Sequence, residues 1–177
     1  MFSFFRFSSR GHSGACINVH GHTWKFEVGV SADELDAEGF VIDFGVLKRR
    51  VLKPCHDLLD HSLAIGEQTW ADVHMDLAAV GRSLLASRAA VHGASADTTG
   101  PVDSSAPSLN GALNRYAGGM KVAVFPFSPT SERLAQWLHE LADQQLSDDR
   151  VRISYARIYE TLRPVEAVAE FGSGASR

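Results

Sequence analysis

The sequence has few cysteines, no long apolar run and no excess of positive charge. Its two cysteines, Cys16 and Cys55, are too few among 177 residues to build a disulfide framework. No apolar run approaches the length needed to span a bilayer, and the first residues lack the pattern of a signal peptide. The formal net charge is −4 without a basic stripe, which argues against a nucleic-acid-binding surface. We therefore expect a cytoplasmic globular protein without membrane or nucleic-acid partners.

Hydrophobic residues make up 45% of the chain, enough for a sizeable core in a single domain over residues 1–177. Amphipathic spacing predicts one helix from Phe44 to about Pro54, with Asp43 as its N-cap, and a second helix over residues 131–146. Alternation and aromatic content predict strands over residues 2–9, 22–30, 121–127, 151–159 and 164–171. The first two strands are expected to pair antiparallel across the loop 10–19. This grouping of strands and helices favours an α+β layer architecture.

A long segment, at about residues 66–119, interrupts this order. Residues 66–91 show a periodicity typical of a helix, which we expect over roughly residues 70–90. Residues 92–119 are rich in Gly, Ala, Ser, Thr and Pro, which predicts a loop. We expect the helix to cover part of the fold, and a role as a lid over a site is a hypothesis.

Three histidines, His12, His20 and His22, lie within eleven positions. Residues i and i+2 of an extended chain point to the same side, so His20 and His22 can share a metal ion. A third imidazole would leave one position open, as in catalytic zinc sites. The alternative is a turn with two exposed histidines, and imidazole ligands alone do not exclude iron, nickel or copper.

Three further features suggest chemistry, and each has a plainer alternative. Cys16, four residues before His20, is either a thiol that a nearby metal holds as thiolate or a buried apolar residue. Asp60 beside His61 either orients that imidazole and raises its basicity or is an ordinary polar helix end. Glu160, at the end of a strand, either accepts two parallel N–H donors from a guanidine-like ring edge or lies in solvent.

Taken together, these motifs resemble the 6-pyruvoyl-tetrahydropterin synthase / 6-carboxytetrahydropterin synthase family in type and order. The matching stretches are Cys16-Ile-Asn-Val-His20-Gly-His22-Thr-Trp24, Gly39-Phe-Val-Ile-Asp-Phe-Gly-Val-Leu-Lys48, Leu59-Asp-His61, Pro129-Thr-Ser-Glu132 and Tyr159-Glu-Thr161. The spacing between Cys16 and His20 looks like the bacterial queuosine-pathway branch. The resemblance implies a tunnelling fold (T-fold), with a four-stranded antiparallel sheet, two helices on one of its faces, and assembly into hexamers from two trimers.

The resemblance also implies an activity, the zinc-dependent conversion of 7,8-dihydroneopterin triphosphate to 6-carboxytetrahydropterin with release of acetaldehyde and triphosphate. Active sites would lie between subunits. The implied residue roles are zinc ligation by His12, His20 and His22, proton removal by Cys16, proton relay by Asp60 and His61, and pterin binding by Glu160, Thr130 and Ser131.

Two features depart from the family pattern. The stretch Phe7-Ser-Ser-Arg-Gly-His12 places its histidine one residue later than the usual F-x-A-A-H, a shift that a bulge would absorb. The connection between His61 and Thr130 is much longer than usual. Two alternative functions stay open: the 6-pyruvoyl reaction, in which triphosphate is lost but the side chain is kept, and a catalytically silent relative that binds a pterin or purine.

Overall fold

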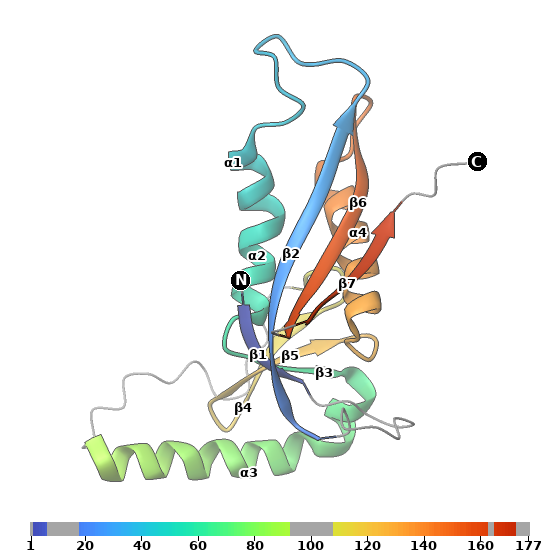
Figure 1. The fold of residues 1–177 in the computed structure, drawn as a ribbon. Helices are drawn as coiled ribbons and strands as arrows, with labels where there is room; N and C mark the ends of the chain where they lie inside the picture. The colour runs from blue at the N-terminus through green and yellow to red at the C-terminus, as the bar shows by residue number, and fades with distance from the viewer. Residues whose placement is uncertain (1, 7–17, 93–107, 163–164, 173–177) are drawn as a thin grey trace. The chain divides into compact units, whose positions relative to one another are not determined.

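The computed structural model describes residues 2–6, 18–92, 108–162 and 165–172, and Figure 1 follows the chain through them. These residues form two compact units. Of the described residues, the first unit holds 2–3, 22–60, 130–162 and 165–172, and the second holds 4–6, 18–21, 61–92 and 108–129. Both units combine helices with strands, which confirms the expected α+β class. Among the described residues, no helix is long and apolar enough to cross a membrane.

An antiparallel sheet is the framework of the first unit. Its strands are β2 (His20–Ala32), β6 (Val151–Leu162) and β7 (Val165–Gly172), with β6 in the middle. The pairing of β2 with β6 runs from Trp24 opposite Glu160 to Ala32 opposite Val151. The strands predicted at 22–30, 151–159 and 164–171 are therefore confirmed, with ends that differ by a few residues.

Helices pack against one face of this sheet. The helix α4 (Ser131–Leu146) lies on β6 and β7 and has the bounds that the sequence predicted. Its inner side carries the apolar residues of the predicted stripe, all of them buried: Leu134, Trp137, Leu138 and Leu141. A second helical stretch, α1 (Phe44–Leu47) followed by the π-helical turn η2 (Lys48–Leu52), contacts α4. Asp43 caps α1, as predicted, because its Oδ1 accepts a hydrogen bond from the Gly45 N–H at 2.7 Å.

The prediction that this helical stretch ends at Pro54 is wrong. A further helix, α2 (Lys53–Leu59), follows η2 directly, and Pro54 lies in its first turn. Proline lacks the N–H of a regular helical hydrogen bond, and Pro54 lies where the π-helical pattern changes to the α-helical one. The wider π-helical turn immediately before it marks the position where the regular α-helical hydrogen-bond pattern is interrupted.

A bulge in β6 decides which side chains face the helices. Gly29 pairs with Tyr155 and the next residue, Val30, pairs with Ile153, so Ser154 is an extra residue in β6. An extra residue reverses the alternation of side chains along a strand. Ile153 is buried before the bulge, and the even-numbered Ala156 and Ile158 are buried after it. Glu160 therefore shares the helix-covered side of the sheet with these residues.

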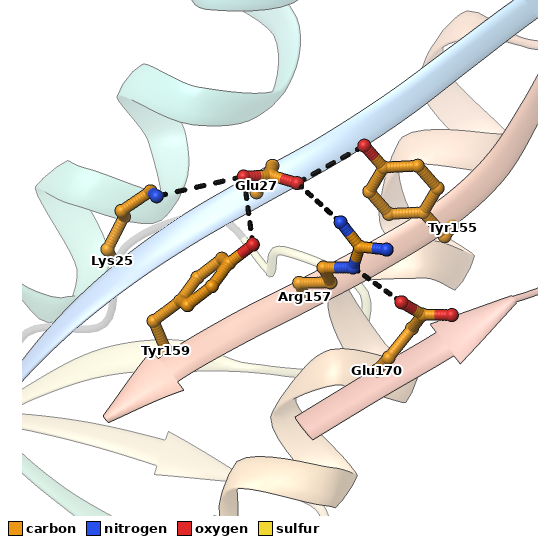
Figure 2. Close-up of polar contacts among 6 residues, drawn as sticks. All are labelled: Lys25, Glu27, Tyr155, Arg157, Tyr159 and Glu170. Atoms are coloured by element: carbon orange, nitrogen blue, oxygen red, sulfur yellow. Dashed lines mark hydrogen bonds and ion pairs between the residues drawn. The ribbon is translucent and has the colours of Figure 1, made fainter. Parts of the chain in front are cut away.

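The opposite side of the sheet carries a charged and aromatic network, shown in Figure 2. Glu27 lies at its centre and accepts hydrogen bonds from Tyr155 at 3.2 Å, Tyr159 at 3.2 Å and Arg157 at 3.1 Å. Arg157 also pairs with Glu170 of β7. Burial disfavours ionisation of Glu27, but these hydrogen bonds and the charge of Lys25 outweigh it and lower the pKa of Glu27 below its ordinary value.

The lowered pKa of Glu27 predicts a loss of stability in acid. A carboxylate with a lower pKa in the folded state stabilises the fold above its unfolded pKa, and this stabilisation disappears as the pH falls through the folded pKa. We expect the Glu27→Gln variant to lose stability at pH 7 and to show a weaker further decrease below about pH 4.5 than the wild type does. Urea unfolding at pH 7 and pH 3 measures both effects, and equal acid sensitivity of the two proteins would contradict the prediction.

The second unit is a small sheet with one long helix. The strands β3 (Leu63–Gly66) and β5 (Met120–Phe125) pair in parallel, and β4 (Leu113–Ala117) pairs antiparallel with β5. The helix α3 (Glu67–His92) packs on these strands. Their shared core comprises Leu63, Ile65, Ala117, Val122 and Val124, with Trp70, Val73, Leu77, Ala78 and Met120 packed against it.

Close backbone approach fixes α3 on the β4–β5 turn. A Cβ atom on Gly81 would lie 2.3 Å from the carbonyl oxygen of Ala117, and one on Gly118 would lie 2.1 Å from that of Ala78. Gly118 also has a φ of +57°, which non-glycine residues rarely adopt. The two glycines therefore allow the helix and the turn to touch.

The structure confirms the predicted helix and corrects the rest of the expectation for this segment. β4 lies within residues 92–119, where a loop was expected, and β3 was not predicted. The expected strand at 2–9 is β1 (Phe2–Arg6), which pairs in parallel with β3 at Phe5 and Arg6. The resemblance implied a four-stranded antiparallel sheet with a helical and loop insertion, and the second unit adds to this the parallel pairings of β3 with β1 and with β5. The crossover through α3 allows β3 and β5 to run parallel. The loop 10–19, expected to join the first two strands, lies largely outside the described residues.

Candidate active site

His22 occupies a buried position on the helix-covered side of β2. Its side chain is 4% exposed, and its ring stacks on that of Trp24 with 5.7 Å between centroids and 25° between planes. Trp24 pairs directly with Glu160 of β6. Cross-strand neighbours on one face of a sheet lie within reach of each other, both directly and diagonally. The register therefore brings the carboxylate of Glu160 to the imidazole of His22.

Glu160 contacts His22 at ion-pair distance. Its Oε1 lies 2.8 Å from His22 Nδ1, in an electrostatic contact without the alignment of a hydrogen bond. Its Oε2 accepts a hydrogen bond from the hydroxyl of Ser131 at 3.0 Å. Ser131 is the first residue of α4, where the helix dipole favours a negative charge. Three residues selected from the sequence, His22, Ser131 and Glu160, are thus brought together.

His20, at the start of β2, also has an oxygen beside Nδ1. The carbonyl oxygen of Asn18 lies 2.7 Å from this nitrogen. A carbonyl oxygen only accepts hydrogen bonds, so Nδ1 of His20 is the donor, and in the neutral ring Nε2 is then the nitrogen with the lone pair. Asn18 was part of the quoted motif but received no role, because a backbone acceptor leaves no signal in the side-chain sequence.

Both histidines have an oxygen beside Nδ1, as metal-binding histidines usually do. Metal-binding imidazoles almost always donate their second nitrogen to a carboxylate or carbonyl oxygen, which fixes the ring and its tautomer. His20 has the carbonyl of Asn18 and His22 has the carboxylate of Glu160 at this position. His12 and Cys16 lie outside the described residues, and residues within the described ranges form no group of three metal-binding side chains. Each contact is of the kind that orients a zinc-binding imidazole, and ligation of zinc by His12, His20 and His22 stays a prediction.

Asp60 and His61 lie where α2 ends. The backbone N–H of Asp60 donates to the carbonyl of His56 at 2.8 Å and closes the helix. His61 follows with a φ of +53°, in the left-handed region that few non-glycine residues adopt. The location agrees with the plainer alternative of a polar helix end, and a proton relay by this pair stays a prediction.

Thr130 caps the N-terminus of α4. Its hydroxyl oxygen accepts a hydrogen bond from the N–H of Arg133 at 3.2 Å, so Thr130 is the N-cap of α4. Capping fixes the start of the helix, and with it the position of Ser131 beside Glu160. Contact of Thr130 with a pterin ring stays a prediction. Cys55, which the sequence suggested was a packing residue, is fully buried, and burial raises the pKa of its thiol.

Comparison with known proteins decides the family. The model of the family described as 6-pyruvoyl tetrahydropterin synthase matches residues 2–170. The chain belongs to this family. It is a family of pterin synthase lyases that typically depend on zinc and that share the T-fold.

Relatives of this chain within the family carry one name. A protein from Haemophilus influenzae, named 6-carboxy-5,6,7,8-tetrahydropterin synthase, is 27% identical over 154 residues, which cover 85% of this chain and 82% of that protein. A protein of the same name from Bacillus subtilis is 46% identical over 57 residues. That shorter match covers 32% of this chain and spans only 36% of the Bacillus protein.

A solved structure shares the fold at larger evolutionary distance. An uncharacterized protein from Wolinella succinogenes superposes with a TM-score of 0.68 and 20% identity, covering 98% of this chain and 94% of that one. At this identity the similarity establishes the fold alone. Because it extends over nearly the whole chain, it includes the segment between His61 and Thr130 that the sequence marked as unusual for the family.

Proposed function

We propose that this chain is a zinc-dependent 6-carboxytetrahydropterin synthase. It would convert 7,8-dihydroneopterin triphosphate to 6-carboxytetrahydropterin and release acetaldehyde and triphosphate. Family membership and the names of the relatives support the class of reaction. The observation that carries the proposal within this chain is the contact of Glu160 with His22, because it prepares a buried imidazole for a metal ion.

The proposed residue roles divide the chemistry between a metal and a thiol. His20 and His22, with His12, would hold zinc, which supplies Lewis-acid polarisation of substrate hydroxyls when bound. Cys16 would remove a proton from the side chain of the substrate, and a lowered thiol pKa near the metal would help it do so. Asp60 and His61 would relay protons. Glu160, Thr130 and Ser131 would hold the pterin ring.

Assembly into a homo-oligomer, a hexamer by family resemblance, is part of the proposal. The first unit leaves large apolar side chains exposed: Leu35 by 60%, Phe40 by 49% and Phe44 by 81%. They line a pocket of about 330 Å³ together with residues of β2. Contiguous apolar surface of this kind favours burial against a partner. A mass measurement in solution tests the assembly, and a monomer at micromolar concentration would contradict it.

Product analysis tests the proposed reaction. Zinc-loaded protein is incubated with 7,8-dihydroneopterin triphosphate, the pterins are identified by mass spectrometry, and acetaldehyde is trapped as a hydrazone. We expect 6-carboxytetrahydropterin and acetaldehyde in equal amounts. A 6-pyruvoyl product without acetaldehyde would assign the chain to the other reaction of its family. Unchanged substrate in the presence of bound zinc would favour a silent pterin-binding relative.

The Cys16→Ala variant is the matched test of the thiol. Cys55→Ala is its control, because Cys55 is fully buried in the first unit. We expect product formation to fall in the Cys16 variant by about 10² to 10⁴-fold, the usual contribution of a positioned acid or base. The Cys55 variant is expected to keep its activity at a temperature where it remains folded.

A further inference from the structure

Both carboxylate oxygens of Glu160 are engaged by the protein itself. Oε1 lies 2.8 Å from His22 Nδ1, and Oε2 accepts the hydrogen bond of the Ser131 hydroxyl at 3.0 Å. The side chains of His22 and Glu160 are only 4% and 19% exposed, so water screens their interaction weakly. Glu160 therefore has specific protein partners in the absence of substrate, which a role in binding the substrate ring alone does not explain.

We infer that Glu160 is a positioning residue for His22, which it orients for metal binding before any substrate arrives. The inference rests on the proposed function, because it assumes that His22 is a metal ligand. A carboxylate oxygen 2.8 Å from a ring nitrogen attracts a proton on that nitrogen and repels a lone pair. Glu160 therefore favours the proton on Nδ1 and leaves the lone pair on Nε2, the nitrogen that would face a metal.

The surrounding structure holds both partners of this contact in place. Trp24 stacks on the ring of His22 and restricts its rotation. The bulge at Ser154 sets the alternation of β6 so that Glu160 shares a face with Trp24, its partner in the ladder. Ser131 fixes the second carboxylate oxygen, and Thr130 fixes Ser131 by capping α4. Such supporting contacts are what keep a metal ligand in one orientation.

The inference differs from a ring-anchoring role in what it predicts without substrate. A carboxylate that only binds the pterin leaves the zinc affinity of the substrate-free protein unchanged when it is replaced. A carboxylate that positions His22 raises the zinc affinity directly, and loss of such a partner typically weakens metal binding 10 to 100-fold. Zinc affinity of the substrate-free protein therefore separates the two roles.

The experiment measures zinc affinity by competition with a chelator for the wild type, Glu160→Ala and Glu160→Gln. We expect Glu160→Ala to bind zinc about 10 to 100-fold more weakly. Glu160→Gln should recover part of this loss, because its amide oxygen keeps a partial negative charge beside the Nδ1 proton. Glu34→Gln, in an exposed loop of the same unit, is the matched control and should bind zinc like the wild type. Far-UV circular dichroism confirms that each variant is folded.

A double-mutant cycle shows whether Glu160 acts through His22. In a His22→Ala background, Glu160→Ala should not weaken the residual zinc binding further. A wild type that binds zinc, together with a folded Glu160→Ala variant whose affinity stays within twofold, would overturn the inference and leave the proposed function intact. A wild type that binds no zinc, or a His22→Ala variant with unchanged affinity, would instead overturn the proposed function.

Discussion

The His22→Ala variant is expected to lose tightly bound zinc and nearly all product formation. A bound zinc ion contributes several kcal/mol to transition-state stabilisation, and each 1.36 kcal/mol corresponds to a factor of ten in rate. We therefore expect the rate to fall about 10³-fold or more. The structure gives the physical reason, because His22 is the buried imidazole that Glu160 contacts and Trp24 holds in place.

Zinc content after dialysis and the initial rate of product formation measure this effect. His56→Ala is the matched control, since His56 lies on α2 with its side chain 48% exposed and its Nδ1 3.7 Å from Asp57 Oδ1. The control should keep about one zinc per chain and its rate. A His22→Ala protein that is folded, retains its zinc and works at the wild-type rate would show that the metal, if any, is bound elsewhere.

The sequence was sufficient to find His22 and Glu160 but not to predict their contact. Residue spacing placed both on strands, and their motifs marked them as candidates. Which face each side chain occupies depends on the register of β2 and β6, and one extra residue, Ser154, reverses that alternation. A bulge of this kind has no distinct sequence signal here, since Ser154 and Tyr155 are ordinary strand residues. The pairing of β2 with β6, and not the local sequence pattern, therefore determines that His22 and Glu160 lie on the same face.

In the second unit, the local sequence pattern predicted the helix but not the strands β3 and β4. The helix α3 was predicted because its apolar residues recur at helical spacing, and only its ends differ. β3 has four residues, all buried, and so short an apolar run does not distinguish a strand from other buried structure. β4 mixes polar and apolar residues within a segment rich in Gly, Ala and Ser, so composition favoured a loop. Both strands exist because pairing with β5 satisfies their backbone hydrogen bonds.

Because the long segment at about residues 66–119 forms most of the second unit, its deletion would not test a lid role alone. Deleting residues 66–117 would remove α3 and β4 and would expose the core residues Ile65, Val122 and Val124. Lost activity after such a deletion would then report unfolding as well as any lid function. Substitution of the exposed α3 residues Val80 and Leu84, 50% and 59% exposed, by serine tests the lid hypothesis without uncovering the core.

Trp137→Ala is expected to be the most destabilising single substitution in α4. Trp137 is 1% exposed and is one of the two largest fully buried side chains of the described structure. Replacing a buried tryptophan by alanine removes its burial free energy and leaves a cavity, at a cost of about 3–5 kcal/mol. The free energy of unfolding of a typical domain is only about 5–15 kcal/mol, so a large share of the stability is lost.

Urea unfolding followed by far-UV circular dichroism measures this loss at a fixed protein concentration, because an oligomer gains stability as its concentration rises. Gln144→Ala, at an exposed position of the same helix, is the control and should change the free energy of unfolding by less than about 0.5 kcal/mol.

The two variants also show whether the packing of α4 affects zinc binding. α4 begins at Ser131, beside Glu160, so loosening the helix in Trp137→Ala should weaken zinc binding as well, whereas Gln144→Ala should leave it unchanged. A Trp137→Ala protein as stable as the wild type would show that the packing of α4 on β6 and β7 is not what holds this side of the site together.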